Sequence, residues 1–150
     1  MKKFLLLLLV CIAFISCKDD NTELKEGHYN LEIIGRYSLD SIDYENYSGN
    51  QYMQLSKVGN DTYEIYELYA GEIVSPKSLI NVYDENKIKG TIYLNPNDTA
   101  SIEGSINGDK IVGVIKGTYT YYWGPPIGGG SRTVPMNGTF SMEYQREYPQ

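Results

Sequence analysis

The stretch TVPMNGTFSMEYQ, residues 133–145, is the clearest indication of the fold, because apolar and polar side chains alternate along it. The even-numbered positions are apolar or small: Val134, Met136, Gly138, Phe140, Met142 and Tyr144. Most of the odd-numbered positions are polar: Thr133, Asn137, Thr139, Ser141, Glu143 and Gln145. Successive side chains of a β-strand point to opposite faces of the sheet. The alternation therefore predicts a strand with one face in the core and the other in water.

The same period of two continues toward the N-terminus as far as residue 31, in apolar runs separated by short polar turns. The pattern predicts about eight strands and no helix. The predicted strands are Leu31–Leu39, Gln51–Val58, Thr62–Tyr69, Ser78–Tyr83, Lys87–Leu94, Ala100–Ile106, Lys110–Trp123 and Thr133–Gln145. The abundance of Tyr and Gly, 15 of each in 150 residues, also indicates an all-β protein.

Short connections join these strands, and their residues favour tight turns. Asn107-Gly108 is the clearest hairpin signal, because it lies between two alternating runs and both residues tolerate positive φ. The other predicted turns are Gly59-Asn60-Asp61, Asp84-Glu85-Asn86 and Asn95-Pro96-Asn97-Asp98. A run of hairpins gives an antiparallel meander, which hides its edges most simply by closing into an up-and-down barrel. A barrel of this size holds its own side chains or one small ligand.

The predicted strand Lys110–Trp123 carries Gly113 and Gly117 on the same face as its apolar residues. Such glycines either bend a strand at a barrel corner or make room for a large neighbour. Val112 and Val114 occupy the opposite face. The pattern therefore predicts a strand that is covered on both sides near its start.

The N-terminal segment has the features of a signal peptide. Lys2 and Lys3 precede an apolar run over residues 4–15, which is too short to span a bilayer. The residues Phe14-Ile15-Ser16-Cys17 resemble the lipobox that lipoprotein signal peptidase recognises, with Phe14 in place of the usual Leu. The resemblance implies lipidation of Cys17, and several acyl chains on one residue give a permanent anchor. The alternative is ordinary cleavage after Ser16, which leaves Cys17 as a free thiol without a partner.

Lys18, Asp19 and Asp20 resemble the export signal that sends some Gram-negative lipoproteins to the outer face of the outer membrane. The alternative is a charged, solvated linker. Residues 18–30 are polar and aperiodic, which predicts a flexible tether. The predicted organisation is a signal peptide over residues 1–16, a lipidated Cys17 with an acidic tether over residues 17–30, and one β-barrel domain over residues 31–150.

The formal net charge of −6 argues against nucleic acid as a partner, and loss of Lys2 and Lys3 with the signal peptide makes the mature chain more acidic. His28 is the only His and falls in the predicted tether, where we assign it no role. The predicted domain contains no Cys, so neither Ser-His nor Cys-His catalysis nor a zinc site has its parts.

Two carboxylate pairs remain as candidates for acid/base catalysis: Asp43 with Glu45 and Glu64 with Glu67. Charges on solvated strand faces are the more ordinary interpretation. We therefore predict a protein that is not an enzyme and has no catalytic residues, no metal site and no cofactor.

The segment from Tyr119 to Arg132 is the best candidate for a binding surface. Tyr119, Tyr121, Tyr122 and Trp123 lead into the loop GPPIGGG, residues 124–130, which is long for a protein of short turns. Aromatic rings beside a long loop suit stacking on a sugar or covering an apolar ligand. The alternative is that the rings plug the end of the barrel.

In layout the predicted domain resembles the calycins, the lipocalin and avidin group of small barrels. Gly35-Arg36-Tyr37 stands in the first predicted strand where those families carry Gly-x-Trp, with Tyr37 in place of the Trp. Arg146 follows the last strand, where lipocalins have a basic residue that packs over that Trp. The resemblance implies a lipocalin-like barrel with Arg146 near Tyr37, and it transfers no ligand.

Two tripeptides, Asp40-Ser41-Ile42 and Asp98-Thr99-Ala100, are similar to the Asp-Ser/Thr-apolar acceptor for O-glycosylation in exported proteins of some of these bacteria. The similarity makes Ser41 and Thr99 candidate acceptors.

Two functional hypotheses follow from these patterns. The first is a surface-anchored, lipocalin-like binding module that holds a small apolar or glycan ligand near the Tyr119 to Trp123 end. The second is a protein-interaction barrel, an inhibitor or envelope assembly factor, with a filled interior. The two differ in whether the barrel is hollow.

Overall fold

The computed structural model of the protein describes residues 23–39, 42–123 and 129–146. This part of the chain is all β, with the following strands: β1 (Gly27–Leu39), β2 (Ile42–Lys57), β3 (Thr62–Tyr69), β4 (Glu72–Ile73), β5 (Ser78–Tyr83), β6 (Lys87–Asn95), β7 (Asp98–Asn107), β8 (Lys110–Trp123) and β9 (Gly130–Gln145).

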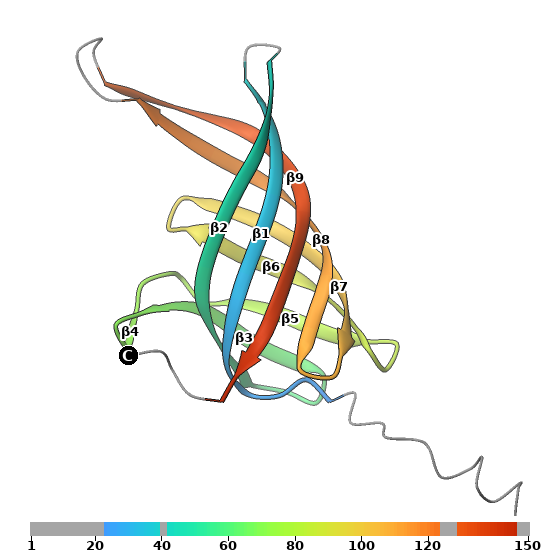
Figure 1. Cartoon of the computed structure of the whole chain (residues 1–150). Coiled ribbons are helices and arrows are strands. Elements are labelled where there is room, and N and C mark those ends of the chain that lie inside the picture. Colours follow the sequence, from blue (N-terminus) through green and yellow to red (C-terminus); the bar gives the residue numbers. More distant parts are fainter. Residues whose placement is uncertain (1–22, 40–41, 124–128, 147–150) are drawn as a thin grey trace, which may run out of the picture.

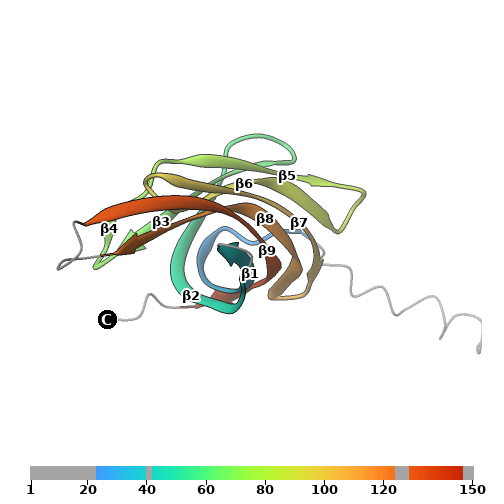
Figure 2. The ribbon, with the colours of Figure 1, turned by 90° about the horizontal axis from the view of Figure 1, so that it is seen from above.

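The strands form one antiparallel sheet in the order β2-β1-β9-β8-β7-β6-β5-β3-β4, and an additional β2–β3 pairing closes it (Figure 1). Apart from the two-residue β4, each strand pairs with its neighbours in the chain, and β1 pairs with β9. The result is a closed barrel of eight strands plus one extra strand. Seen from above, β1, β2 and β9 curl back toward the strands of the other wall (Figure 2). The predicted lipocalin-like up-and-down barrel is confirmed.

The turn chemistry acts as predicted at the β7–β8 hairpin. Asn107 pairs with Lys110, and Gly108 has a φ of 62°, which glycine adopts without strain. Asp84 and Glu85 in the β5–β6 turn also have positive φ. The local turn residues therefore fix the meander.

The domain begins earlier than the sequence pattern predicted. Strand β1 starts at Gly27 rather than Leu31, and Leu24 is only 3% exposed. His28 lies in β1, where it pairs with Gln54 on β2 and Gln145 on β9. The flexible tether therefore cannot extend to residue 30. Residues 27–30 do not show the alternation that predicts a strand. They are β structure because their backbones pair with β2 and, from His28 onward, also with β9.

Strand β2 also begins earlier than predicted, at Ile42 rather than Gln51. Its additional residues pair with β1 across a β-bulge between Gly35 and Arg36. The run over residues 42–50 mixes tyrosines with charged residues and glycine, so it carries no clear alternation. These residues form a strand because their backbones pair with β1, although their own sequence does not predict one.

Side chains fill the described interior of the barrel. The alternation of β9 is confirmed, since Val134, Met136, Phe140 and Met142 are buried. Several inward-facing aliphatic side chains on different strands are fully inaccessible: Leu31, Ile33, Leu55, Ile80, Ile88, Ile92 and Met142. A side chain that lined a ligand-sized cavity would stay open to a water molecule. The described core is therefore packed by the protein itself.

The inward-facing glycines mark places where strands approach too closely for a side chain. A Cβ atom at Gly113 would overlap with the carbonyl oxygen of Glu103 on β7. A Cβ atom at Gly104 would lie 3.0 Å from Cζ of Phe140. At Gly113 and Gly117 the nearest atoms belong to the neighbouring strand β7 and not to a large ring, so these glycines permit close approach of β7 and β8.

Two expectations for particular residues are wrong. Val112 is 38% exposed and Val114 is 59% exposed, so β8 is not covered on both sides near its start. The β1–β9 register joins Tyr37 to Met136 and His28 to Gln145. Arg146 therefore follows the end of the ladder farthest from Tyr37, about 30 Å away, and cannot pack over it as the lipocalin resemblance implied.

Candidate functional site

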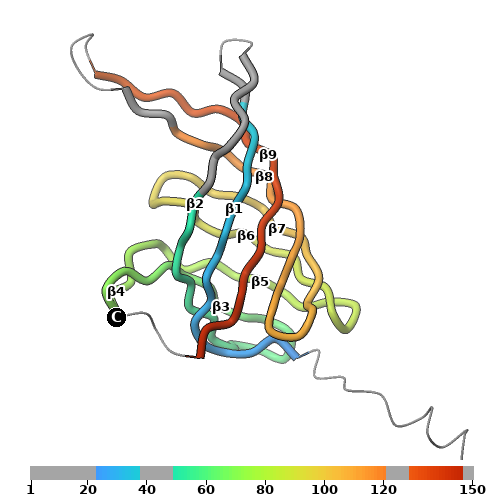
Figure 3. The backbone as a smooth tube through the Cα atoms, in the orientation of Figure 1, coloured from blue at the N-terminus to red at the C-terminus, as the bar shows by residue number. Residues whose placement is uncertain are grey.

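Beyond the barrel wall, β8 and β9 continue as a two-stranded ribbon. Pairing of β8 with β7 ends at Gly117, and pairing of β9 with β1 ends at Met136. The ladder between β8 and β9 goes on from Thr118 opposite Pro135 to Trp123 opposite Gly130. We call residues 118–123 and 130–135 the β8–β9 arm. It projects from the barrel, and none of the other described strands pairs with either of its outer edges (Figure 3).

The arm lies at the end of the barrel opposite the described N-terminus. Strands β1 and β8 are both antiparallel to β9, so they run in the same direction. Their last residues, Leu39 and Trp123, are therefore at one end, and the described chain begins and ends at the other (Figure 1). An anchor that precedes residue 23 would leave the arm on the side away from the membrane.

A buried carboxylate holds the base of the arm. Asp98, the first residue of β7, is 1% exposed. Its Oδ2 accepts a hydrogen bond of 3.0 Å from the backbone N–H of Thr120, and its Oδ1 accepts one of 2.7 Å from the Thr120 hydroxyl. The Thr118 hydroxyl lies 3.4 Å from the same Oδ1. The Thr120 hydroxyl also lies 3.0 Å from that of Thr133, so the contact reaches both strands of the arm.

The turn itself presents Asp98 to the arm. The side-chain carbonyl of Asn95 accepts hydrogen bonds from the backbone N–H groups of Asn97 and Asp98, and its Nδ2 donates to Asp98 Oδ2 at 2.6 Å. Burial opposes ionisation of Asp98, but the hydrogen bonds from Thr120, Asn95 and Thr118 outweigh burial and hold its pKa below the ordinary value. Asp98 is therefore an ionised group built into the fold.

The structure places the predicted aromatic residues only in part. The ring of Tyr119 is half-buried and lies 5.0 Å from that of Tyr37, at an interplanar angle of 38°. Both rings pack against the core, so Tyr119 helps to fill this end of the barrel. Tyr121, Tyr122 and Trp123 pair through their backbones with β9, and their side chains lie outside the described part. The loop over residues 124–128 lies outside it too.

Other predicted sites lie outside the described residues: Cys17, Lys18, Asp19, Asp20 and Ser41. Thr99 is exposed on β7 opposite Tyr93. The preceding Asp98 is buried, so an enzyme that reads an Asp-Thr pair would not find the aspartate on the folded surface.

The described carboxylates do not assemble into a catalytic pair. Glu64 forms a salt bridge of 2.7 Å with Lys77. Glu67 lies on the inward face of β3 with buried Tyr63 and Ile65, whereas Glu64 lies on the other face. The side chains of Asp43 and Glu45 are outside the described part. Within residues 23–39, 42–123 and 129–146, no group of three or more His, Cys, Asp or Glu side chains could hold a metal ion.

A hydrogen bond from a side chain joins β2 to the end of β6, although these two strands do not pair with each other in the described sheet. Gln51 on β2 is buried, and its Nε2 donates a hydrogen bond of 2.8 Å to the carbonyl oxygen of Leu94. Burial raises the pKa of Glu67, and a hydrogen bond from Gln51 partly offsets this. Gln51 therefore links β2 to β6 just beyond Tyr52, where the described β2–β3 ladder ends.

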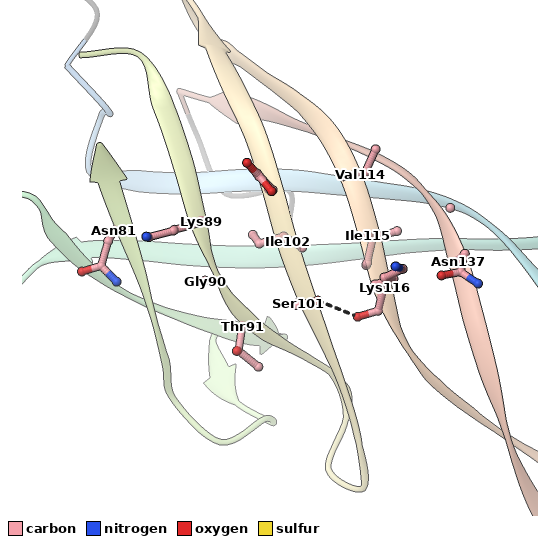
Figure 4. A pocket seen from close by; sticks show the side chains of 12 residues that line it. Asn81, Lys89, Gly90, Thr91, Ser101, Ile102, Val114, Ile115, Lys116 and Asn137 are labelled. Atoms are coloured by element: carbon pink, nitrogen blue, oxygen red, sulfur yellow. Dashed lines mark hydrogen bonds between the residues drawn. The ribbon is translucent and has the colours of Figure 1, made fainter. Parts of the chain in front are cut away.

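The outer wall carries a groove of about 780 Å³ across β5 to β9. Its outward-facing residues come from alternate positions of five strands: Asn81, Lys89, Thr91, Ser101, Glu103, Val114, Lys116 and Asn137 (Figure 4). The sequence alone does not indicate this groove, since its residues come from five separate strands. The period of two places each residue on the outer face, but only the strand register brings them side by side.

Comparison with protein-family models and with curated proteins finds no match to this chain. A search of the described residues for helices long and apolar enough to cross a membrane also finds none. Proposals about function therefore depend on the sequence patterns and on the geometry above.

Proposed function

We propose that this protein is a lipid-anchored, non-enzymatic module of the outer membrane surface that binds a protein partner through the β8–β9 arm. The anchor is the lipidated Cys17, and the acidic residues after it direct the protein outward. This is the second of the two functional hypotheses, and the packed interior is the observation that carries it.

The interior supports this choice because a barrel that stores a ligand needs space for it. Ile33 and Leu55, on different strands of the described core, are both inaccessible. Tyr37 and Tyr119 pack against that core at the arm end. A small apolar ligand would have to displace these side chains, at the cost of their packing. Recognition at the outer surface requires no such displacement.

The arm supports protein binding because, among the described strands, β7 and β1 pair with β8 and β9 only as far as Gly117 and Met136, so the arm beyond them is an edge of the sheet. An extended segment of a partner adds readily to such an edge by β-augmentation, in which backbone hydrogen bonds supply affinity. An isolated two-stranded ribbon is marginally stable in water. The contacts of Asp98 hold the base of this arm in one position, so the arm loses less conformational entropy when a partner binds.

The anchor is tested by replacing Cys17 with Ser. We expect the Cys17→Ser variant to lose the acyl chains and to leave the membrane fraction, since the chains are the attachment. Fractionation of cells and metabolic labelling with a palmitate analogue measure this. Cys11→Ser, the same substitution at the other Cys of the chain and outside the lipobox, is the control. A Cys17→Ser variant that stays membrane-bound and labelled would contradict lipidation at this residue.

The arm is tested by photo-crosslinking in intact cells. We expect a benzoylphenylalanine at position 132, on the exposed edge of the arm, to give a discrete crosslinked species. The same probe at position 69, where Tyr69 is 74% exposed on β3, is the control and should give none. Replacing residues 121–132 by Asn-Gly shortens the arm but keeps Thr120 and Thr133, and it should abolish capture from a probe at position 118. Equal crosslinking from positions 132 and 69 would contradict the proposal.

A further inference from the structure

We propose that the outer groove across β5 to β9 binds an oligosaccharide that carries carboxylate groups, of the uronic acid type. The groove is distinct from the β8–β9 arm, and this proposal does not depend on the partner of the arm. The observations behind it are the shape of the groove, the chemistry of its lining and two lysines that form no salt bridge with any described carboxylate.

The shape suits a flat, extended ligand. The groove runs across five neighbouring strands, from Asn81 on β5 to Asn137 on β9 (Figure 4). Its volume of about 780 Å³ is in the range of ordinary ligand sites. The exposed side chain of Val114 and the aliphatic stems of the lysines offer apolar surface for the C–H face of a sugar ring.

The polar lining suits hydroxyl groups. Amide or hydroxyl side chains come from four strands: Asn81, Thr91, Ser101 and Asn137. Each can donate and accept hydrogen bonds, which matches the alternating donors and acceptors of a sugar. The Ser101 hydroxyl donates a hydrogen bond of 3.0 Å to the carbonyl oxygen of Lys116, so the lone pairs of its oxygen can accept one from a ligand hydroxyl. A protein partner would instead favour aromatic anchors, and Val114 is the one exposed large apolar residue of this lining.

The charges favour an anionic ligand. Four lysines of the described residues have carboxylate partners: Lys25, Lys57, Lys77 and Lys87. Lys89 and Lys116, which flank the groove, form no salt bridge within the part of the chain that the structure describes. The Lys89 ammonium lies 5.1 Å from the centroid of the Tyr83 ring, a cation–π contact that leaves its positive charge available to an anion.

One carboxylate opposes the two ammonium groups. Glu103 lines the groove and pairs across the strands with Lys89, but its Oε1 accepts a hydrogen bond of 2.8 Å from the Tyr83 hydroxyl. The local balance is therefore positive in a protein whose formal net charge is −6. At physiological salt the more distant negative charges are screened beyond about 8 Å, so the two lysines dominate at the groove.

Titration calorimetry of the full chain in mild detergent tests the proposal, with oligogalacturonate as the probe. We expect binding that weakens with added salt, and an affinity about tenfold lower for the Lys89→Gln/Lys116→Gln double variant, which loses two charge-assisted contacts. Lys57→Gln/Lys77→Gln removes the same charge from residues outside the groove and should bind as the unmodified chain does. Glu103→Gln should bind more tightly, because it removes the opposing charge.

Two further probes make the result decisive. The methyl ester of the same oligogalacturonate lacks the charges and should bind at least tenfold more weakly. An aspartate-rich peptide of equal charge tests for an acidic protein instead. The proposal is overturned if oligogalacturonate does not bind, if the ester binds equally well, if both double variants lose affinity alike, or if the peptide alone binds.

Discussion

Replacing Gly113 with Ala should lower the free energy of unfolding by about 3 kcal/mol, the largest effect we expect from the addition of a single methyl group. The added Cβ would overlap with the carbonyl oxygen of Glu103 and lie against the Cα of Gly104. Both are backbone atoms of β7, so no side-chain rotation relieves the contact. The β7–β8 ladder must shift, and the packing of Phe140 beside Gly104 shifts with it.

Gly59→Ala is the matched control for this variant. Gly59 lies between β2 and β3, and an added Cβ would meet only the Thr62 side chain, at 3.4 Å, an ordinary contact distance. Urea denaturation should place the two variants about 3 kcal/mol apart, and thermal unfolding should separate them by about 10 °C. Equal stability would show that β7 and β8 have room to spare, and it would contradict the close strand approach described here.

The second large effect concerns Asp98. We expect Asp98→Ala to cost about 2 to 3 kcal/mol, because the backbone N–H of Thr120 and the Nδ2 of Asn95 lose a buried, charged acceptor. The loss should be concentrated at the base of the arm. Hydrogen exchange should therefore show faster exchange at residues 118–123 and 130–135, with little change in β1 and β2.

The contribution of Asp98 should also depend on pH. Its hydrogen bonds hold the folded pKa below the unfolded value, so the unfolded chain binds more protons at acid pH and stability rises with pH. The contribution is complete above the unfolded pKa of about 3.9 and is lost as the pH falls through the folded value. The stability difference between the unmodified protein and Asp98→Asn should therefore shrink from pH 7 to pH 2.

Asp61→Asn is the control for the charge itself, since Asp61 is exposed. It should change stability by less than about 0.5 kcal/mol at pH 7. A pH-independent difference between Asp98→Asn and the unmodified protein would mean that Asp98 acts by shape alone. Unchanged exchange in the arm of Asp98→Ala would mean that another contact holds it.

The strand pattern of the barrel wall follows from the local order of residues in the chain. Residues 133–145 alternate because one face meets the core, and the buried Met136, Phe140 and Met142 confirm that pattern. Asn107-Gly108 fixed a hairpin because its requirement for positive φ is local. Such properties depend on neighbours in the chain, so they can be read from the chain. The strand starts at Gly27 and Ile42 could not, because they depend on pairing to remote strands.

The sites on the wall depend on contacts between segments that are far apart in the chain. Whether a barrel is hollow depends on how side chains from different strands meet in its centre, and the inaccessible Ile33 and Leu55 show that they fill the described core. Asp98 reads as a turn residue in sequence, yet the β8–β9 arm passes over it and buries it. Lys89 and Lys116 lie far apart in the chain and line the same groove. Sites of this kind depend on contacts between distant segments, which no local pattern encodes.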